Sequence, residues 1–124
     1  MILDTNALSA FADGHREIRP YVESSEIVIP VVVLGEYRYG ISHSVRRIRY
    51  EAWLNTFLPA IQVLEINRET ALWYSQIRSE LRHAGKLIPA NDVWIAALSK
   101  QHSLPILSRD RHFDQVKGLQ RIGW

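Results

Sequence analysis

Short apolar runs alternate along this chain with longer stretches of helical periodicity, and no junction carries the Asn-Gly type of signal that marks a tight β-hairpin. Strands that are separated by helices pair through crossover connections, so this pattern predicts a parallel sheet. Helices then cover both faces of that sheet. The expected fold class is therefore α/β: a three-layer α/β/α sandwich with a short, mainly parallel sheet.

Apolar spacing, together with helix caps and breakers, locates the individual elements. Strands are predicted at Met1–Asp4, Glu26–Ile29, Ile61–Ile66 and Leu104–Leu107, with an edge strand at Leu119–Ile122. Helices are predicted at Asn6–Ala12, Arg16–Ser24, Pro30–Gly40, Ser44–Leu58, Asn67 to just before Gly85, Asn91–His102 and Arg111–Val116. The chain contains no internal repeat, low-complexity tract or linker, so residues 1–124 are expected to form a single domain.

Two of these helices have a recognisable cap. Asn67 is expected to cap the longest helix, in which Leu72 and Ile77 belong to a run of apolar residues spaced in threes and fours. Ser44 is expected to cap another, in which Val45 and Ile48 recur at helical spacing.

Composition excludes several classes of protein. The chain has no cysteine, which rules out disulfides, thiolate metal sites and cysteine nucleophiles. The longest apolar run, Ile27–Leu34, is interrupted by Pro30 and is far shorter than the roughly 20 residues of a membrane helix. With no secretion signal at its start, the chain is expected in the cytoplasm. Arginine outnumbers lysine by 12 to 3, which slightly favours a phosphate-bearing or acidic partner.

Four carboxylates fall where the sequence predicts burial or a sheet edge. Asp4 ends the first strand, and Asp110 follows the fourth. Asp92 lies in the first turn of an unusually apolar helix, and Glu36 lies inside an otherwise apolar stretch. Because open parallel sheets bind their ligands at the carboxyl ends of the strands, these acids are candidate site residues.

Carboxylates that converge on one pocket repel one another unless a cation neutralises them. Oxygen ligands without cysteine or histidine suit Mg²⁺ or Mn²⁺, which also accept phosphate oxygens from a substrate. Such a centre can acidify a water molecule and stabilise charge on a phosphodiester. The residues therefore predict metal-dependent phosphodiester hydrolysis. Taken one at a time, each acid could equally serve as a helix cap or a surface charge.

The order and spacing of these motifs resemble the PIN-domain ribonucleases, most closely the VapC toxins of VapBC type II toxin–antitoxin modules. Four matching segments span nearly the whole chain: Leu3-Asp4-Thr5-Asn6-Ala7-Leu8, Leu34-Gly35-Glu36-Tyr37-Arg38-Tyr39-Gly40, Asn91-Asp92-Val93-Trp94-Ile95-Ala96-Ala97 and Ser108-Arg109-Asp110-Arg111-His112-Phe113. Each motif is weak alone, but four in this order are fairly specific.

The resemblance implies that Asp4, Glu36, Asp92 and Asp110 form an acidic catalytic pocket that binds Mg²⁺ or Mn²⁺, with Asp4 and Asp92 as the foremost ligands. It further implies that Asn6 and Ser108 orient the carboxylates, Ser108 standing where the family more often has threonine. Asp114 is a candidate for the rim of the pocket, although a helix-terminal acid is the simpler interpretation. The histidines are scattered without metal-ligand spacing and receive no catalytic role.

Basic and aromatic residues are concentrated between Tyr37 and Tyr50. Arginines can hold a phosphate backbone while aromatic rings stack on unpaired bases, so this segment is a candidate RNA-binding surface. It could equally bind an antitoxin or be an ordinary solvated helix face. The candidate binding residues are Arg38, Arg46, Arg47 and Arg49.

The residues predict metal-dependent phosphodiester hydrolysis, and the resemblance implies an endoribonuclease that acts as the toxin of a toxin–antitoxin pair. The partners that the resemblance implies are an RNA substrate, a VapB-like antitoxin and a second copy of the chain in a homodimer, and no membrane is expected. One alternative is a non-catalytic PIN-like module that binds RNA or protein. Another is an aspartate-nucleophile phosphatase, which usually needs a second aspartate where this chain has Asn6.

Overall fold

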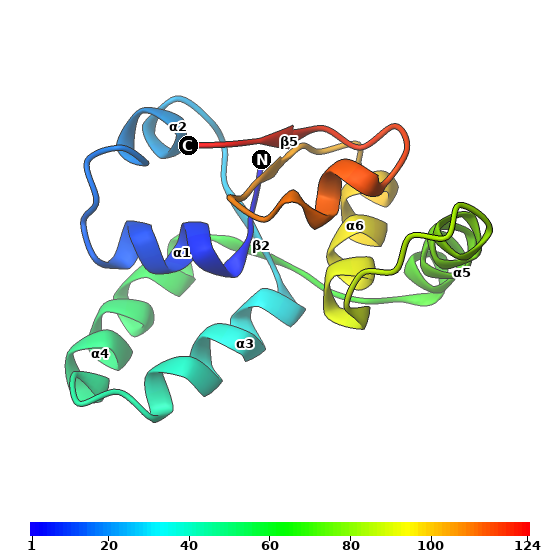
Figure 1. Cartoon of the computed structure of the whole chain (residues 1–124). Coiled ribbons are helices and arrows are strands. Elements are labelled where there is room, and N and C mark those ends of the chain that lie inside the picture. The colour runs from blue at the N-terminus through cyan, green and yellow to red at the C-terminus, as the bar shows by residue number, and fades with distance from the viewer.

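A computed structural model describes residues 1–124 and shows a five-stranded sheet flanked by helices (Figure 1). The strands are β1 (Ile2–Leu3), β2 (Val28–Pro30), β3 (Gln62–Leu64), β4 (Ile106–Leu107) and β5 (Arg121–Ile122). The α-helices are α1 (Thr5–Ala12), α2 (Arg19–Glu23), α3 (Val31–Ser42), α4 (Arg47–Phe57), α5 (Arg68–His83) and α6 (Ala90–His102). Two short 3₁₀ helices are η1 (Leu58–Ala60) and η2 (Arg111–Gln115).

All neighbouring strands are parallel, in the order β3-β2-β1-β4-β5, which confirms the expected α/β fold. The strands are only two or three residues long; β1, β2 and β4 are buried throughout, whereas the edge strands β3 and β5 are partly exposed. β1 lies in the middle of the sheet, so the residue that follows it is placed centrally at the carboxyl edge. That residue is Asp4.

Helices are grouped around this sheet in two sets (Figure 1). In this view α1, α3 and α4 lie together on one side of the molecule, and α5 lies beyond α6 on the other. The faces that these helices turn inward join the strands in one core of 26 buried apolar residues. In α3 the buried residues Val33, Tyr37 and Ile41 recur every four positions, as expected of a helix that buries one stripe.

Caps fix where the key helices begin. Asn67 caps α5 as the sequence predicts, and its side chain and that of Thr70 each accept from the other's backbone N–H. Gly85, at φ 68°, follows the end of that helix. Proline precedes both α3 and α6, at Pro30 and Pro89, where a missing N–H does no harm.

Several expected boundaries differ in the structure. The helix expected at Arg16–Ser24 is reduced to α2, and that expected from Ser44 begins only at Arg47. Ser44 does not cap α4; its hydroxyl instead accepts from the Arg46 backbone N–H in the preceding turn, at 3.0 Å. Each strand is shorter than expected. β2 is also shifted, because Pro30, which the sequence places at the start of a helix, pairs with Leu64 as the last residue of β2, and α3 runs from Val31 to Ser42.

Some apolar residues at helical spacing do not face the core. Val45 and Ile48 are 102% and 86% exposed, and Leu72 is 73% exposed. Helical periodicity therefore identified the helices without identifying every buried position. No helix combines the length and the hydropathy needed to cross a bilayer.

Candidate active site

Strand register brings the first candidate residues together. Leu3 pairs with Leu107 across β1 and β4, so the next residues, Asp4 and Ser108, leave the sheet side by side. The Asp4 backbone N–H donates to the Leu107 carbonyl at 3.1 Å, which continues the ladder to this point. Two residues that are 104 positions apart in the sequence are thus held as neighbours by the parallel sheet.

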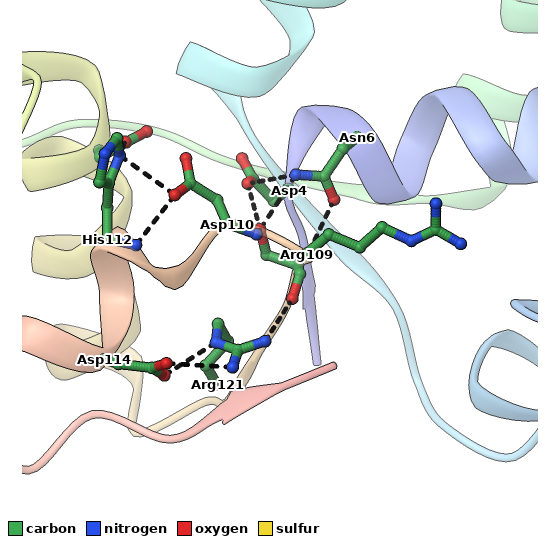
Figure 2. Close-up of polar contacts among 9 residues, drawn as sticks. Asp4, Asn6, Arg109, Asp110, His112, Asp114 and Arg121 are labelled. Carbon is green, nitrogen blue, oxygen red and sulfur yellow. Dashed lines mark hydrogen bonds and ion pairs between the residues drawn. The ribbon is translucent and has the colours of Figure 1, made fainter. Parts of the chain in front are cut away.

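Asp4 is buried and accepts three hydrogen bonds, of which Figure 2 shows the one from Asn6. Its Oδ1 accepts from the Thr5 backbone N–H at 2.8 Å, which makes Asp4 the N-cap of α1. Its Oδ2 accepts from the Ser108 hydroxyl at 2.6 Å and from the Asn6 amide at 3.2 Å. The cap interpretation and the site interpretation of Asp4 are therefore compatible, because different oxygens serve each.

Ser108 is the centre of this network. Its buried hydroxyl donates to Asp4 and accepts from the Asn6 amide at 3.1 Å and from the Asp110 backbone N–H at 2.9 Å. The Asn6 carbonyl oxygen in turn accepts from the Arg109 backbone N–H at 3.1 Å. The structure thus places Ser108 and Asn6 in contact with Asp4 and with the loop that carries Asp110.

A second group of polar side chains, which could bind a cation, lies where α6 meets η2. Asp110 caps η2, its Oδ1 accepting from the His112 backbone N–H at 2.9 Å. The His112 ring nitrogen Nδ1 lies 3.0 Å from Asp92 Oδ2 and 3.1 Å from Asp110 Oδ1. One ligand atom from each of these three residues lies within 4.8 Å of the other two. A single cation could contact all three.

Glu36 completes the acidic cluster from α3. It lies one residue before buried Tyr37, at the edge of the buried stripe of that helix, and is partly buried. Its Oε1 accepts from the Thr5 hydroxyl at 3.2 Å. Thr5 therefore links Asp4 and Glu36, by its backbone to the first and by its side chain to the second.

The four carboxylates influence one another electrostatically. Burial raises the pKa of Asp4, and the charges of Asp92 and Asp110 raise it further, although the hydrogen bonds from Ser108 and Thr5 oppose this. Burial likewise raises the pKa of Glu36, and the charges of Asp4 and Asp92 add to the rise. The pKa of Asp92 is raised by burial and by Asp110. The acids therefore face one region of negative potential.

This donor set fits a divalent cation. Asp92, Asp110 and His112 each offer one ligand atom to a common cation, and Asp4 and Glu36 lie near enough for the neighbouring carboxylates to raise their pKa values. A cation would neutralise this excess negative charge. Oxygen donors dominate, which suits Mg²⁺ or Mn²⁺. The four acids were proposed from the sequence, whereas His112 was not. No second histidine lies at metal-ligand spacing from it on a helix, so the sequence carries no signal that marks it as a ligand.

Arg121 supports the loop from outside the cluster (Figure 2). Its guanidinium donates to the Ser108 carbonyl at 3.0 Å and to both carboxylate oxygens of Asp114, at 2.8 and 3.0 Å. The hydrogen bonds from Arg121 lower the pKa of Asp114. Asp114 is thus engaged in an ion pair. Sequence reasoning missed Arg121, because nothing near it in the chain marks it as part of the site.

The candidate binding arginines lie elsewhere. All four are exposed on α3, α4 and the turn between them: Arg38, Arg46, Arg47 and Arg49. Arg47 pairs with Glu51 one turn further along α4, at 2.9 Å. Of the tyrosines expected to stack on bases, Tyr37 is buried and packs edge-on against Trp53. Tyr37 therefore cannot contact RNA in this structure, whereas Tyr39 is 73% exposed.

Comparisons with known proteins agree with this architecture. The PIN domain family matches residues 1–119. The tRNA(fMet)-specific endonuclease VapC of Shigella flexneri is 30% identical over 104 residues, covering 83% of this chain and 79% of that protein. Ribonuclease VapC4 of Mycobacterium tuberculosis is 31% identical over 96 residues, covering 76% and 74%.

Solved structures show the same fold. DNA-bound VapBC from Salmonella typhimurium superposes with a TM-score of 0.88 at 25% identity, covering 99% of this chain and 96% of that one. VapBC2 from Rickettsia felis, bound to a fragment of promoter DNA, superposes with a TM-score of 0.89 at 23% identity, covering 99% and 97%. The chain therefore belongs to the PIN-domain family, within the VapC group of ribonucleases.

Proposed function

We propose that this chain is a divalent-metal-dependent endoribonuclease and the toxin of a toxin–antitoxin pair, acting in the cytoplasm. The observation that carries the proposal is the convergence of Asp4, Glu36, Asp92 and Asp110 on one region, where burial and mutual repulsion raise the pKa of the first three. Ribonucleases and endonucleases among its relatives support the same reaction class.

Mg²⁺ or Mn²⁺ is the proposed cofactor, with Asp4 and Asp92 as its foremost ligands and Glu36 and Asp110 completing the set. When bound, such a cation makes water more acidic and offsets the negative charge that builds on a phosphodiester during hydrolysis. Ser108 and Asn6 hold Asp4 in place through their hydrogen bonds to Oδ2. Because these donors favour the ionised form of Asp4, they keep it ready to bind a cation.

We assign the exposed arginines of α3 and α4 chiefly to the antitoxin. The tip that carries Arg46, Arg47 and Arg49 also exposes Val45 and Ile48 almost completely. A phosphate backbone offers little to cover two such apolar side chains, whereas an amphipathic protein segment can bury them while acidic groups pair with the arginines. The solved VapBC complexes are consistent with a protein partner of this kind. A homodimer is the proposed assembly of the toxin itself.

A non-catalytic PIN-like binding module is the second candidate. Nothing in the cluster favours it, because all four carboxylates are present and none is neutralised by a salt bridge to lysine or arginine. An aspartate-nucleophile phosphatase is disfavoured, since Asn6 donates to Asp4 and to Ser108 and offers no second carboxylate.

The test is cleavage of a pool of small RNAs by purified, antitoxin-free chain with Mg²⁺, Mn²⁺ or EDTA. The proposal expects discrete products that vanish with EDTA and in Asp4→Asn and Asp92→Asn. Glu69→Gln, at an exposed carboxylate of α5, is the matched control and should cleave normally. Folded wild-type protein that cuts no RNA with either metal would overturn the proposal in favour of the binding module.

A further inference from the structure

His112 is a titratable side chain of the acidic cluster that the proposed reaction does not yet use. Its Nδ1 lies 3.0 Å from Asp92 Oδ2 and 3.1 Å from Asp110 Oδ1. One ring nitrogen thus faces two carboxylates that come from different parts of the chain, α6 and the start of η2. The ring is 44% exposed, so solvent and ions can reach it.

Local structure holds this arrangement in place. Asp110 caps η2 through the His112 backbone N–H, which fixes the two residues next to each other. η2 packs against α6, which brings in Asp92 from its first turn. The position of His112 therefore follows from the same cap that positions Asp110.

Two of the three separations between these ligand atoms, those from Nδ1, match the spacing of ligands around a cation. An octahedral cation with bonds of about 2.1 Å places neighbouring ligand atoms about 3.0 Å apart. The observed separations from Nδ1 are 3.0 and 3.1 Å. A proton on Nδ1 points well at only one acceptor, whereas a cation between the three atoms contacts both carboxylates and the nitrogen lone pair.

We propose that His112 Nδ1 is a nitrogen ligand of the divalent cation, beside Asp92 and Asp110, and that it biases the site toward Mn²⁺ over Mg²⁺. This inference rests on the proposed metal-dependent function. Mg²⁺ is bound mainly by oxygen, whereas imidazole is a good ligand for later and softer divalent metals. A single nitrogen among carboxylates therefore changes the relative affinity for the two ions.

The test is Mn²⁺ binding to the full chain, followed by electron paramagnetic resonance. Pulsed measurements detect ¹⁴N bonded directly to Mn²⁺. They are made on wild type, on His112→Asp, which replaces the nitrogen donor by oxygen, and on His102→Asn, an exposed histidine at the far end of α6. We expect ¹⁴N coupling in wild type and His102→Asn and none in His112→Asp. We also expect the ratio of Mn²⁺ to Mg²⁺ affinity to fall about tenfold or more in His112→Asp.

Two results would overturn the ligand role alone. One is wild-type Mn²⁺ binding that depends on Asp92 yet shows no ¹⁴N coupling. The other is tighter Mn²⁺ binding by His112→Ala, which would show that the ring competes with the metal for the carboxylates. If wild type binds no Mn²⁺ and cuts RNA equally well in EDTA, the proposed function fails and this inference fails with it.

Discussion

Replacing Ser108 with alanine should weaken both the fold and the site, by an amount that depends on pH. The hydroxyl donates to Asp4 Oδ2 at 2.6 Å in a fully buried position. A hydrogen bond to an ionised acceptor contributes about 1.5–3 kcal/mol, and the Asp110 N–H left without its acceptor costs about 1 kcal/mol more. The Asn6 amide loses its bond to Ser108 but still donates to Asp4, so it adds little to this cost. We therefore expect Ser108→Ala to lose about 2.5–4 kcal/mol of unfolding free energy at pH 7.5.

The same substitution should reduce metal affinity. Because the Ser108 hydrogen bond lowers the pKa of Asp4, its removal raises that pKa and makes a proton a stronger competitor for the cation. Loss of a group that orients a ligand typically weakens metal binding about 10–100-fold. The destabilisation should shrink as pH falls through the pKa of Asp4 in the folded protein, because a neutral acid accepts a weaker hydrogen bond.

Urea denaturation in EDTA at pH 7.5 and pH 4, with calorimetric titration of Mn²⁺, measures these effects. Ser99→Ala is the matched control, since its hydroxyl is also buried but donates to the neutral Leu104 carbonyl at 2.5 Å. It should cost about 1 kcal/mol at both pH values and leave metal affinity unchanged. Equal losses in the two variants, independent of pH and of metal, would refute the reasoning.

Three further predictions follow from the charges. Burial raises the pKa of three of the site carboxylates in the folded chain, so metal-free protein should lose stability as pH rises from about 4 through these raised pKa values. Urea midpoints should show this slope, and saturating Mg²⁺ should flatten it. Arg121→Met should lower the rate of RNA cleavage and reduce the free energy of unfolding by about 1–3 kcal/mol. Asp114→Asn should affect cleavage less, because it leaves the hydrogen bond from Arg121 to the Ser108 carbonyl intact. Equal cleavage rates for the two variants would argue against a positioning role for Arg121. Replacing Arg46 and Arg47 with alanine should weaken antitoxin binding and make that binding less dependent on salt. RNA affinity, measured at two salt concentrations, should change little. A large loss of RNA affinity would instead show that these arginines bind the RNA substrate.

The fold and the four acids could be predicted because each depends on local or strongly patterned information. Alternating strands and helices without hairpin turns favour a parallel sheet, and acids that follow its strands, as Asp4 and Asp110 do, meet at its carboxyl edge. The helix cap at Asn67 is equally local, because the two residues that form it, Asn67 and Thr70, lie three positions apart in the sequence.

Other features depend on contacts that the sequence does not encode locally. Arg121 reaches Ser108 only because β5 pairs with β4, and His112 meets Asp92 only because η2 packs on α6. The exposure of Ile48 was missed for a different reason: helical periodicity indicates which residues share a face, but not whether another element covers that face. Val45 lies in the turn before α4 and shares no helix face with Ile48.

The most direct test of the central claim is to identify the nucleophile. RNA is cleaved by the wild-type chain with Mg²⁺ in ¹⁸O-labelled water, and the new termini are examined by mass spectrometry at early times. Hydrolysis by water at the carboxylate site predicts one ¹⁸O in the product phosphate and no 2′,3′-cyclic phosphate, with all cleavage lost in EDTA. Unlabelled cyclic phosphate ends, formed equally well in EDTA, would show that the ribose 2′-hydroxyl attacks and would contradict the account.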